Sequence, residues 1–267
     1  MINVTHKGIL ILLIVSSASG IACQKTTTAP NVSGVASLNI VNAINTSSAV
    51  IPVIGTSSPI SWFNRAQSVG YGLFCEYSAV AGYDTIYVVQ DNADTLNIGA
   101  KSHGMLYYNI GNLRKGGIYS LFLCGADTNS PDYLFVTDTL QYYPPTDSVT
   151  GIRFVNLVAG ADPISINLEG NSNGSEVSSL LYKNITSFKQ YVNNSTVIDY
   201  FFVVRDALTG DSLTQFDFNQ NGGSNQGYGL TDPNNTNLLT FRNVTIAVFG
   251  NANNSNYPLN TMLIDNY

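Results

Sequence analysis

The sequence predicts an all-β protein that holds two β-sandwich domains in tandem. Short runs of β-branched and aromatic residues are separated by Gly, Asn, Asp, Ser and Pro, a spacing typical of sandwiches and small barrels. No stretch keeps the apolar helical period of about 3.6 residues over three turns. One strand–loop–strand pattern also occurs twice along the chain. From these observations we expect immunoglobulin- or transthyretin-like sandwiches.

Residues 1–22 predict a signal peptide. Lys7 precedes a short apolar run at residues 8–15, and small residues then lead to Cys23. The run is about half the length that a bilayer span needs. The segment Gly20-Ile21-Ala22-Cys23 resembles a bacterial lipobox, which implies lipidation of Cys23 and anchoring to a membrane. Ordinary cleavage after Ala18 or Ala22, with an incidental Cys23, is the alternative.

Residues 23–34 are polar and rich in Thr, Ser and Pro, which predicts a flexible tether. Gln24 stands where an aspartate would resemble an inner-membrane retention signal. We therefore expect the outer membrane, with its periplasmic face and the cell surface both open.

The two copies of the repeated unit define the domains. Residues 37–44 and 151–158 are apolar strands that contain the same step, Val41-Asn42 and Val155-Asn156. Residues 117–125 and 243–250 close each copy, followed by a polar loop and a last strand. We expect a first sandwich at 35–143, a stiff linker at 144–148 and a second sandwich at 149–267. An insertion in the second copy is expected at residues 219–237.

Within each copy the apolar runs predict individual strands. Residues 85–90 are aromatic and β-branched, 163–168 alternate apolar and polar residues, and 200–205 have the composition of a buried strand. The remaining expected strands include 105–108, 133–138 and 261–265.

The second copy resembles a known family. Its opening, Arg153-Phe154-Val155-Asn156 followed by residues 160–170, is similar to the opening of domain-of-unknown-function family 4397 (DUF4397), found in exported bacterial proteins and often in Bacteroidetes lipoproteins. Residues 181–188 and 119–125 resemble later elements of that family. The resemblance covers residues 150–267 and, more weakly, 35–143. It implies a fold and an envelope location, and the family carries no established activity.

Two cysteines, Cys75 and Cys124, remain after Cys23 is assigned to the anchor. An even pair in an oxidising compartment predicts a disulfide between them. Two buried free thiols on neighbouring strands are the alternative.

Composition argues against several classes of function. The net charge is −6 and the few Lys and Arg are scattered, so no basic patch for nucleic acid is expected. His103 is the only histidine after residue 22, which excludes a multi-histidine metal site. The chain has three glutamates and no G-x-S-x-G elbow. We expect no catalytic residues, no metal and no cofactor.

Five sites carry Asp, then Ser or Thr, then an aliphatic residue. This pattern resembles a periplasmic O-glycosylation motif of Bacteroidetes, and it is equally typical of a turn that leads into a strand. We expect Ser148 to be the first acceptor, because a linker should be exposed. The candidate acceptors are Thr85, Thr95, Thr139, Ser148 and Ser212.

Other loops offer candidate contacts. Trp62 is a candidate sugar-stacking platform, although a packed tryptophan is the commoner case. Tyr228 lies in a Gly-rich loop, and loops often carry function. The oxygen-rich loops at 91–94 and 127–132 suit either turn capping or calcium.

Three functions follow as hypotheses. The first is a non-catalytic binding or adhesion module at the cell envelope, with a glycan or an envelope protein as its partner. The second is a structural or accessory subunit of an outer-membrane complex. The third and most remote is a secreted carbohydrate-active enzyme.

Overall fold

The computed structural model confirms an all-β chain. Within its described residues the chain forms fifteen strands and no helix, and so no helix there is suited to crossing a membrane. All of these strands belong to one compact unit, Gly34–Tyr267. The described residues are 34–46, 48–55, 68–91, 104–194, 199–219 and 239–266.

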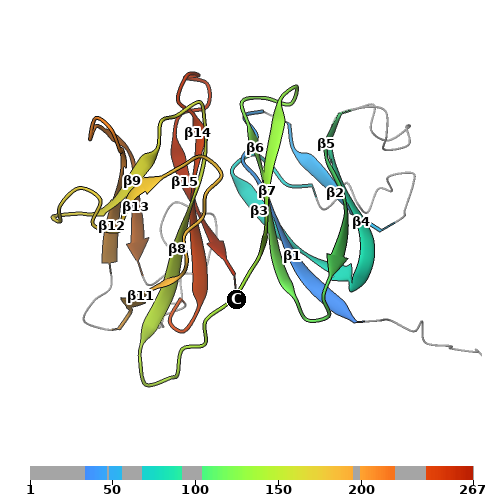
Figure 1. The fold of residues 1–267 in the computed structure, drawn as a ribbon, viewed down its shortest axis with the longest axis horizontal. Helices are drawn as coiled ribbons and strands as arrows, with labels where there is room; N and C mark the ends of the chain where they lie inside the picture. The colour runs from blue at the N-terminus through green and yellow to red at the C-terminus, as the bar shows by residue number, and fades with distance from the viewer. Residues whose placement is uncertain are drawn as a thin grey trace, which may run out of the picture. The chain divides into compact units, whose positions relative to one another are not determined.

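The first half of this unit is a sandwich of two sheets (Figure 1). One sheet has the order β3-β1-β6-β7 and the other has the order β2-β4-β5. The strands are β1 (Val35–Asn42), β2 (Val50–Ile54), β3 (Leu73–Val80), β4 (Gly82–Gln90), β5 (Met105–Leu113), β6 (Ile118–Gly125) and β7 (Pro131–Thr137).

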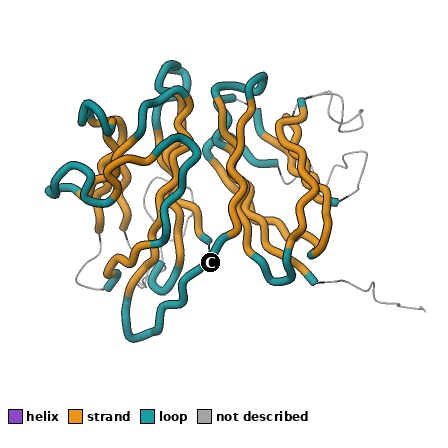
Figure 2. The backbone as a smooth tube through the Cα atoms, viewed as in Figure 1, coloured by secondary structure: helices purple, strands orange, loops and turns teal. Residues whose placement is uncertain are grey.

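The second half repeats this arrangement with eight strands. Its sheets have the orders β11-β8-β14-β15 and β10-β9-β12-β13, and loops join the strands throughout (Figure 2). The strands are β8 (Val149–Ala159), β9 (Ile164–Leu168), β10 (Val177–Leu180), β11 (Lys189–Val192), β12 (Asp199–Asp206), β13 (Ser212–Asn219), β14 (Asn243–Asn251) and β15 (Asn260–Asp265).

The duplication read from the sequence appears as matching strand pairs. β1 runs parallel to β6 in the first half, and β8 runs parallel to β14 in the second. All other strand pairs in the described sheets are antiparallel. The first strand of each copy therefore lies at the centre of its sheet, between an antiparallel and a parallel neighbour.

Each sandwich encloses its own apolar core. In the first, Ile86 and Val88 of β4 point inward to join β1 and β6 residues such as Leu121. In the second, Phe154 of β8 meets Phe202 of β12 edge to face, with ring centroids 5.1 Å apart. The inward residues alternate along each strand, as the period of a β-strand requires.

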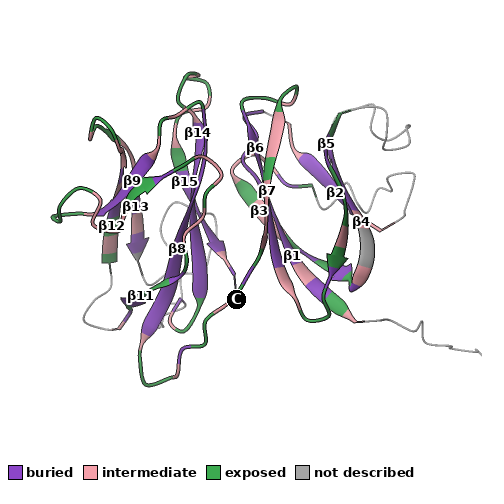
Figure 3. Ribbon diagram, viewed as in Figure 1, coloured by how far each residue is buried: buried purple, intermediate pink, exposed green. Residues whose placement is uncertain are grey.

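A third core lies between the two sandwiches. The sheets that contain β1 and β8 face one another, and Phe122, Val155 and Phe249 are among the residues that fill the space between them. Because both of its faces are covered, β8 has all 11 residues buried, which appears as continuous purple in Figure 3. Strands buried on both faces are expected to have near-continuous apolar sequences. The unit is thus four sheets deep, and the central strands of its two inner sheets, β1, β6, β8 and β14, are almost completely buried.

The connection between the halves packs against the second sandwich. Tyr143 is 3% exposed, and its hydroxyl lies 1.9 Å from where a Cβ on Gly151 would be. The backbone N–H of Gln141 donates to Asn243 Oδ1 at 3.2 Å, and Asn243 Nδ2 donates back to the Gln141 carbonyl at 2.8 Å. Only a glycine at position 151 leaves room for Tyr143. The packed tyrosine in turn holds the start of the predicted linker in place.

Candidate functional site

The repeated Val-Asn step has the same structural role in both halves. Asn156 is buried; its Nδ2 donates to the Leu180 carbonyl at 2.9 Å and its Oδ1 accepts from the Val158 N–H at 3.0 Å. Asn42 donates to the Val69 carbonyl at 3.0 Å in the same way. A buried amide in this position satisfies backbone groups that would otherwise be buried without a partner. This motif therefore specifies the fold rather than chemistry.

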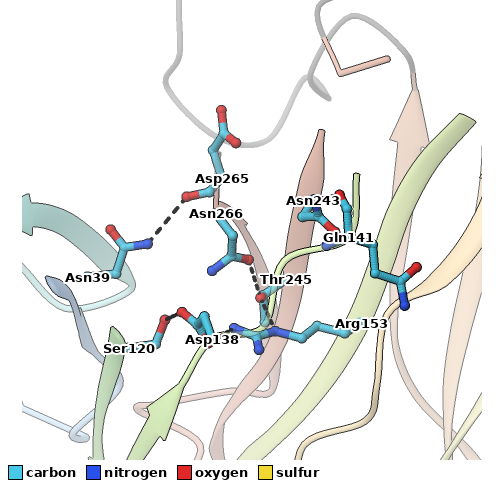
Figure 4. A network of polar contacts seen from close by, with 9 residues as sticks. All are labelled: Asn39, Ser120, Asp138, Gln141, Arg153, Asn243, Thr245, Asp265 and Asn266. Carbon is cyan, nitrogen blue, oxygen red and sulfur yellow. Dashed lines mark hydrogen bonds and ion pairs between the residues drawn. The ribbon is translucent and has the colours of Figure 1, made fainter. Parts of the chain in front are cut away.

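A buried polar network joins the two sandwiches (Figure 4). Arg153 of β8 reaches Asp138, which follows β7, with Nη2 2.6 Å from Oδ1. Asp138 Oδ2 also accepts from Ser120 Oγ at 2.6 Å. On the other side, Arg153 Nε donates to Thr245 Oγ1 at 2.7 Å, and Thr245 donates to Asn266 Oδ1 at 2.5 Å. The network therefore runs without a break from β6 of the first half to the end of the second.

This network is built from duplicated positions whose side chains differ. In each half, a residue of the first strand lies opposite a hydroxyl residue of the neighbouring parallel strand. In each half, the residue that follows the last strand donates its backbone N–H to the first residue of that same parallel strand. The equivalent pairs are Asn39 and Arg153, Ser120 and Thr245, and Asp138 and Asn266. We call the contact between Arg153 and Asp138 the charged arm of the interface. The neutral arm is the contact at the equivalent position, where Asn39 Nδ2 donates to the Asp265 carbonyl at 3.4 Å.

Burial shapes the electrostatics of the charged arm. Desolvation lowers the pKa of Arg153, and the neighbouring Asp138 carboxylate opposes that shift. The guanidinium also lies over the Phe188 ring, 4.6 Å from its centroid, an arrangement that favours a cation. One carboxylate, a hydroxyl and an aromatic face thus hold a charge that would be strongly unfavourable alone.

Further polar contacts cross the interface elsewhere. Asn45 Nδ2 donates to the carbonyl of Gly125 at 3.1 Å and to that of Gly250 at 3.4 Å, the equivalent glycines of the two copies. Tyr71 donates to Asn45 Oδ1 at 3.1 Å, and its ring packs edge to face on Phe249. One amide therefore ties together the two equivalent strand ends.

A contact between Lys183 and Asp132 also links the halves. Lys183 Nζ lies 2.7 Å from Asp132 Oδ1, and the lysine backbone has φ of 60°, which is uncommon for a residue with a side chain. Beside it, the Tyr182 hydroxyl donates to Cys124 Sγ at 3.3 Å. Burial raises the pKa of the Cys124 thiol to about 12. Cys124 is packed in the core between the sandwiches. A reactive cysteine would instead need a lowered pKa.

The predicted disulfide is wrong. Cys75 and Cys124 are both free, and β1 lies between their strands β3 and β6. Cys75 packs on the core of the first sandwich, whereas Cys124 belongs to the core between the sandwiches. The thiols point to opposite faces of one sheet, so the even count reflected two unrelated positions.

The candidate glycosylation sites differ in accessibility. Thr139 and Ser212 are exposed, while Thr85 is half-buried within β4. Ser148 was expected to be exposed; it is half-buried, and its carbonyl accepts from the Asn193 N–H at 2.7 Å. The docked connection explains this difference. Thr95 lies outside the described residues.

Several other sequence-based candidates also lie outside the described residues. These are Cys23, Trp62, Tyr228, His103, most of the 91–94 loop and nearly all of the expected insertion. The 127–132 loop is described, and there Asp127 Oδ1 accepts from the N–H groups of Asn129 and Ser130 at 2.8 and 2.9 Å. This is turn capping, the first of the two interpretations of that loop.

An open groove lies at one end of the second sandwich. It has a volume of about 600 Å³ and lies between the start of β13 and the loop that joins β14 to β15. Its lining combines the amide and hydroxyl groups of residues such as Asn251, Asn254 and Ser212 with the apolar side chains of Leu213 and Leu259. Such a mixed lining suits a ligand that has both hydroxyl groups and apolar faces.

Carboxylates gather elsewhere, on the outer sheet of the second sandwich. Asp217 of β13 has a raised pKa, first because it is desolvated and second because Asp199 is near. The two residues share one face of the β12–β13 pair, and neither lines the groove. Within the described ranges, no three His, Cys, Asp or Glu residues come together as a metal site would require.

No protein-family model matches the chain, and no curated protein matches it.

Sequence reasoning did not find the ion pair between Asp138 and Arg153. The available signal was an arginine inside the otherwise apolar run 151–158, because a charge in a buried strand needs a partner. Nothing local identified Asp138 as that partner, since it lies at the end of the other copy.

Proposed function

We propose that the protein is a non-catalytic binding or adhesion module of the bacterial outer membrane, anchored through lipidated Cys23. The observation that carries this proposal is the buried interface between the sandwiches. The apolar core around Phe122 and Val155, together with the Asp138–Arg153 pair, joins the halves into one block. A rigid block on a tether is suited to holding a binding surface away from a membrane.

Strand order supports one of the two expected sandwich types. An immunoglobulin constant domain places its first strand beside its second. Here the first strand of the second half, β8, lies between β11 and β14, and β9 belongs to the other sheet. We therefore favour the transthyretin-like alternative for both halves.

Membership of DUF4397 remains part of the proposal. The residues that carry the resemblance have structural roles, since Arg153 forms the interface ion pair and Asn156 satisfies two buried backbone groups. Such a motif would mark the duplicated fold without implying any activity.

The groove beside Asn251 and Asn254 is our candidate ligand surface, with a glycan as the candidate ligand. Amides and hydroxyls recognise sugar hydroxyls through hydrogen bonds, and the groove supplies several. Ser212 also lines it, so a glycan attached to Ser212 would occupy the same space. Attachment at Ser212 and ligand binding in the groove are therefore mutually exclusive.

Protease shaving of intact cells tests the location, with wild type compared with Cys23→Ala. We expect wild type to stay with the membrane and to be cleaved from outside, and Cys23→Ala to leave the membrane fraction. Protection of wild type until the outer membrane is opened would refute adhesion at the cell surface.

A glycan-binding screen tests the ligand surface. Asn254→Ala removes a groove amide, and Asn171→Ala removes an exposed amide in the β9–β10 loop as the matched control. We expect only the first to weaken binding. Equal binding by both variants and wild type would refute the groove as the binding surface.

The accessory-subunit hypothesis is favoured by a different observation. The outer face of the β2-β4-β5 sheet carries apolar side chains, including the exposed Tyr108 and Ile110, and exposed apolar surface commonly marks protein contacts. Cross-linking in cells followed by identification of the captured protein would support this function if a different envelope protein is recovered reproducibly.

A further inference from the structure

Edge strands are sites where sheets can pair with other chains, and natural proteins usually protect them. Seven of the eight edge strands in the described sheets carry a recognisable protection. β10 and β11 have only 4 residues each, β2 has 5 and contains Pro52, and β7 begins with Pro131 and Asp132. β3, β13 and β15 contain the carboxylates Glu76, Asp217 and Asp265 respectively.

β5 has none of these three protections, and its one irregularity is a β-bulge at its start, opposite Val88 and Val89. It has 9 residues, Met105-Leu106-Tyr107-Tyr108-Asn109-Ile110-Gly111-Asn112-Leu113, with no charge and no proline. Tyr108 and Ile110 are 48% and 57% exposed, and Met105 is 40% exposed. Long, uncharged, exposed edge strands rich in β-formers are predicted pairing sites.

The sheet face beside this edge is also largely apolar. Tyr108 lies opposite Tyr87 of β4, and Ile110 lies opposite Thr85. Tyr87 belongs to a separate buried cluster with Ile51 and Val53 of β2. β5 is therefore the exposed margin of an apolar sheet face.

We propose that β5 is a self-association edge, which pairs antiparallel with β5 of a second copy of this chain around a two-fold axis at Asn109. Asn109 is the middle residue of the strand, and the exposed run 108–110 is centred on it. In this register Tyr108 lies opposite Ile110 of the second copy. Aromatic and β-branched residues are favourable cross-strand partners, and a two-fold axis lets one strand serve both sides.

Charges at the ends of β5 favour the antiparallel direction. Arg114 and Lys115 follow the strand and are exposed. At its other end, Gly104 accepts from the Gln90 N–H at 2.9 Å, which places Asp91 beside the start of β5. Antiparallel pairing brings the basic end of each copy to the acidic end of the other. Parallel pairing would bring like charges together.

The pairing does not depend on the proposed binding function. It adds one strand pair to a chain whose largest apolar faces are already buried between its own sandwiches. An interface of one edge is smaller than a standard stable interface, so we expect reversible association.

Cysteine cross-linking of the full chain in intact cells tests the register. Directly opposite residues in an antiparallel pair have Cα atoms about 4.5–5.5 Å apart, within the range of a disulfide. We expect Asn109→Cys to give a covalent dimer on mild oxidation. The matched control is Gln215→Cys, an exposed position on edge strand β13, and wild type reports any contribution of Cys75. A dimer band equal in all three chains would overturn the proposal.

A charge placed on the edge tests the association without a cross-link. Ile110→Lys is compared with Leu208→Lys, which alters a residue 72% exposed in the loop after β12. We expect detergent-solubilised wild type and Leu208→Lys to sediment as dimers at high concentration, and Ile110→Lys to dissociate at least about tenfold more readily, because buried unpaired charge is unfavourable. A melting temperature of Ile110→Lys equal to that of the wild type would show that this variant folds.

Two further outcomes would refute self-pairing. One is a wild-type chain that sediments as a monomer at every concentration. The other is capture of a different protein by Asn109→Cys with no dimer of this chain, which would assign the edge to another partner.

Discussion

Asp138 and Arg153 lie 2.6 Å apart across the boundary between the two sandwiches, and their side chains are 0% and 5% exposed. Asp138 follows the last strand of the first half, and Arg153 lies in the first strand of the second. The pair therefore fixes the junction at the point where the chain passes from one half to the other. Buried pairs of this kind often specify an arrangement more than they stabilise it.

Removing one partner of this pair should be strongly destabilising. Asp138→Ala leaves the Arg153 guanidinium buried without its carboxylate, and such changes cost about 3–5 kcal/mol. Urea unfolding monitored by fluorescence measures the loss. A change below about 1 kcal/mol, the value typical of exposed pairs, would contradict the buried ion pair.

The neutral arm of the interface suggests how to restore stability. Asp138→Asn combined with Arg153→Asn reproduces the uncharged side chains found at Asn266 and Asn39, the equivalent positions. We expect the double variant to be more stable than Asp138→Ala, because no uncompensated charge stays buried. A double variant as unstable as the sum of its single variants would argue against coupling between the two residues.

Gly125 should tolerate alanine worse than Gly82 does. Both have positive φ, 122° and 114°, but a Cβ on Gly125 would lie 2.5 Å from the Ser130 carbonyl oxygen, whereas one on Gly82 meets nothing within 4 Å. Gly82→Ala therefore reports backbone strain alone, about 1–2 kcal/mol. Gly125→Ala should lose more than this in thermal or urea unfolding, and an equal loss would contradict the steric argument.

Asn156 should be needed for folding although its residue type suggests a surface position. Asn156→Ala leaves the Leu180 carbonyl and the Val158 N–H without their partner, at about 1–3 kcal/mol for each buried group. Asn171→Ala, at an exposed position, serves as the control and should change the free energy of unfolding by less than about 0.5 kcal/mol.

The two thiols should differ in reactivity. We expect alkylation of the native protein at Cys75, which is half-buried, before Cys124, which is buried.

The free energy of unfolding should fall at high pH. The Cys124 pKa is raised from its ordinary 9.0 to about 12. Between these values the folded protein keeps a proton that the unfolded chain loses, so unfolding is favoured by about 1.4 kcal/mol for each pH unit from this group. Cys124→Ser should show a shallower pH dependence above pH 9, since the group no longer titrates.

If the Asp-Ser/Thr-aliphatic sites are modified, exposure should decide which of them carry glycans. Intact-mass analysis should show loss of one glycan in Ser212→Ala, because Ser212 is exposed. Thr85→Ala should show no loss, because Thr85 is half-buried in mid-strand. The opposite result would mean that modification precedes folding.

The sequence by itself determined the all-β class, many of the strands and the duplicated unit. Period-2 patterning at residues 163–168 predicted the strand β9 but not its burial, because Ser165 and Asn167 are buried together with Ile164 and Ile166. The mainly apolar run of 151–158 did match a strand that is buried on both faces. The repeated Val-Asn step marked the first strand of each copy.

Only the tertiary structure decided which distant groups meet. Cysteine count predicted a disulfide, but the strand order placed Cys75 and Cys124 on opposite faces of a sheet. The same order brought Arg153 to Asp138 and left β5 at the edge of its sheet, with no second strand beside it among the described residues. Side-chain partners across a sheet depend on strand order and on the packing of whole layers, and these arise from the sum of many long-range contacts that no local pattern contains.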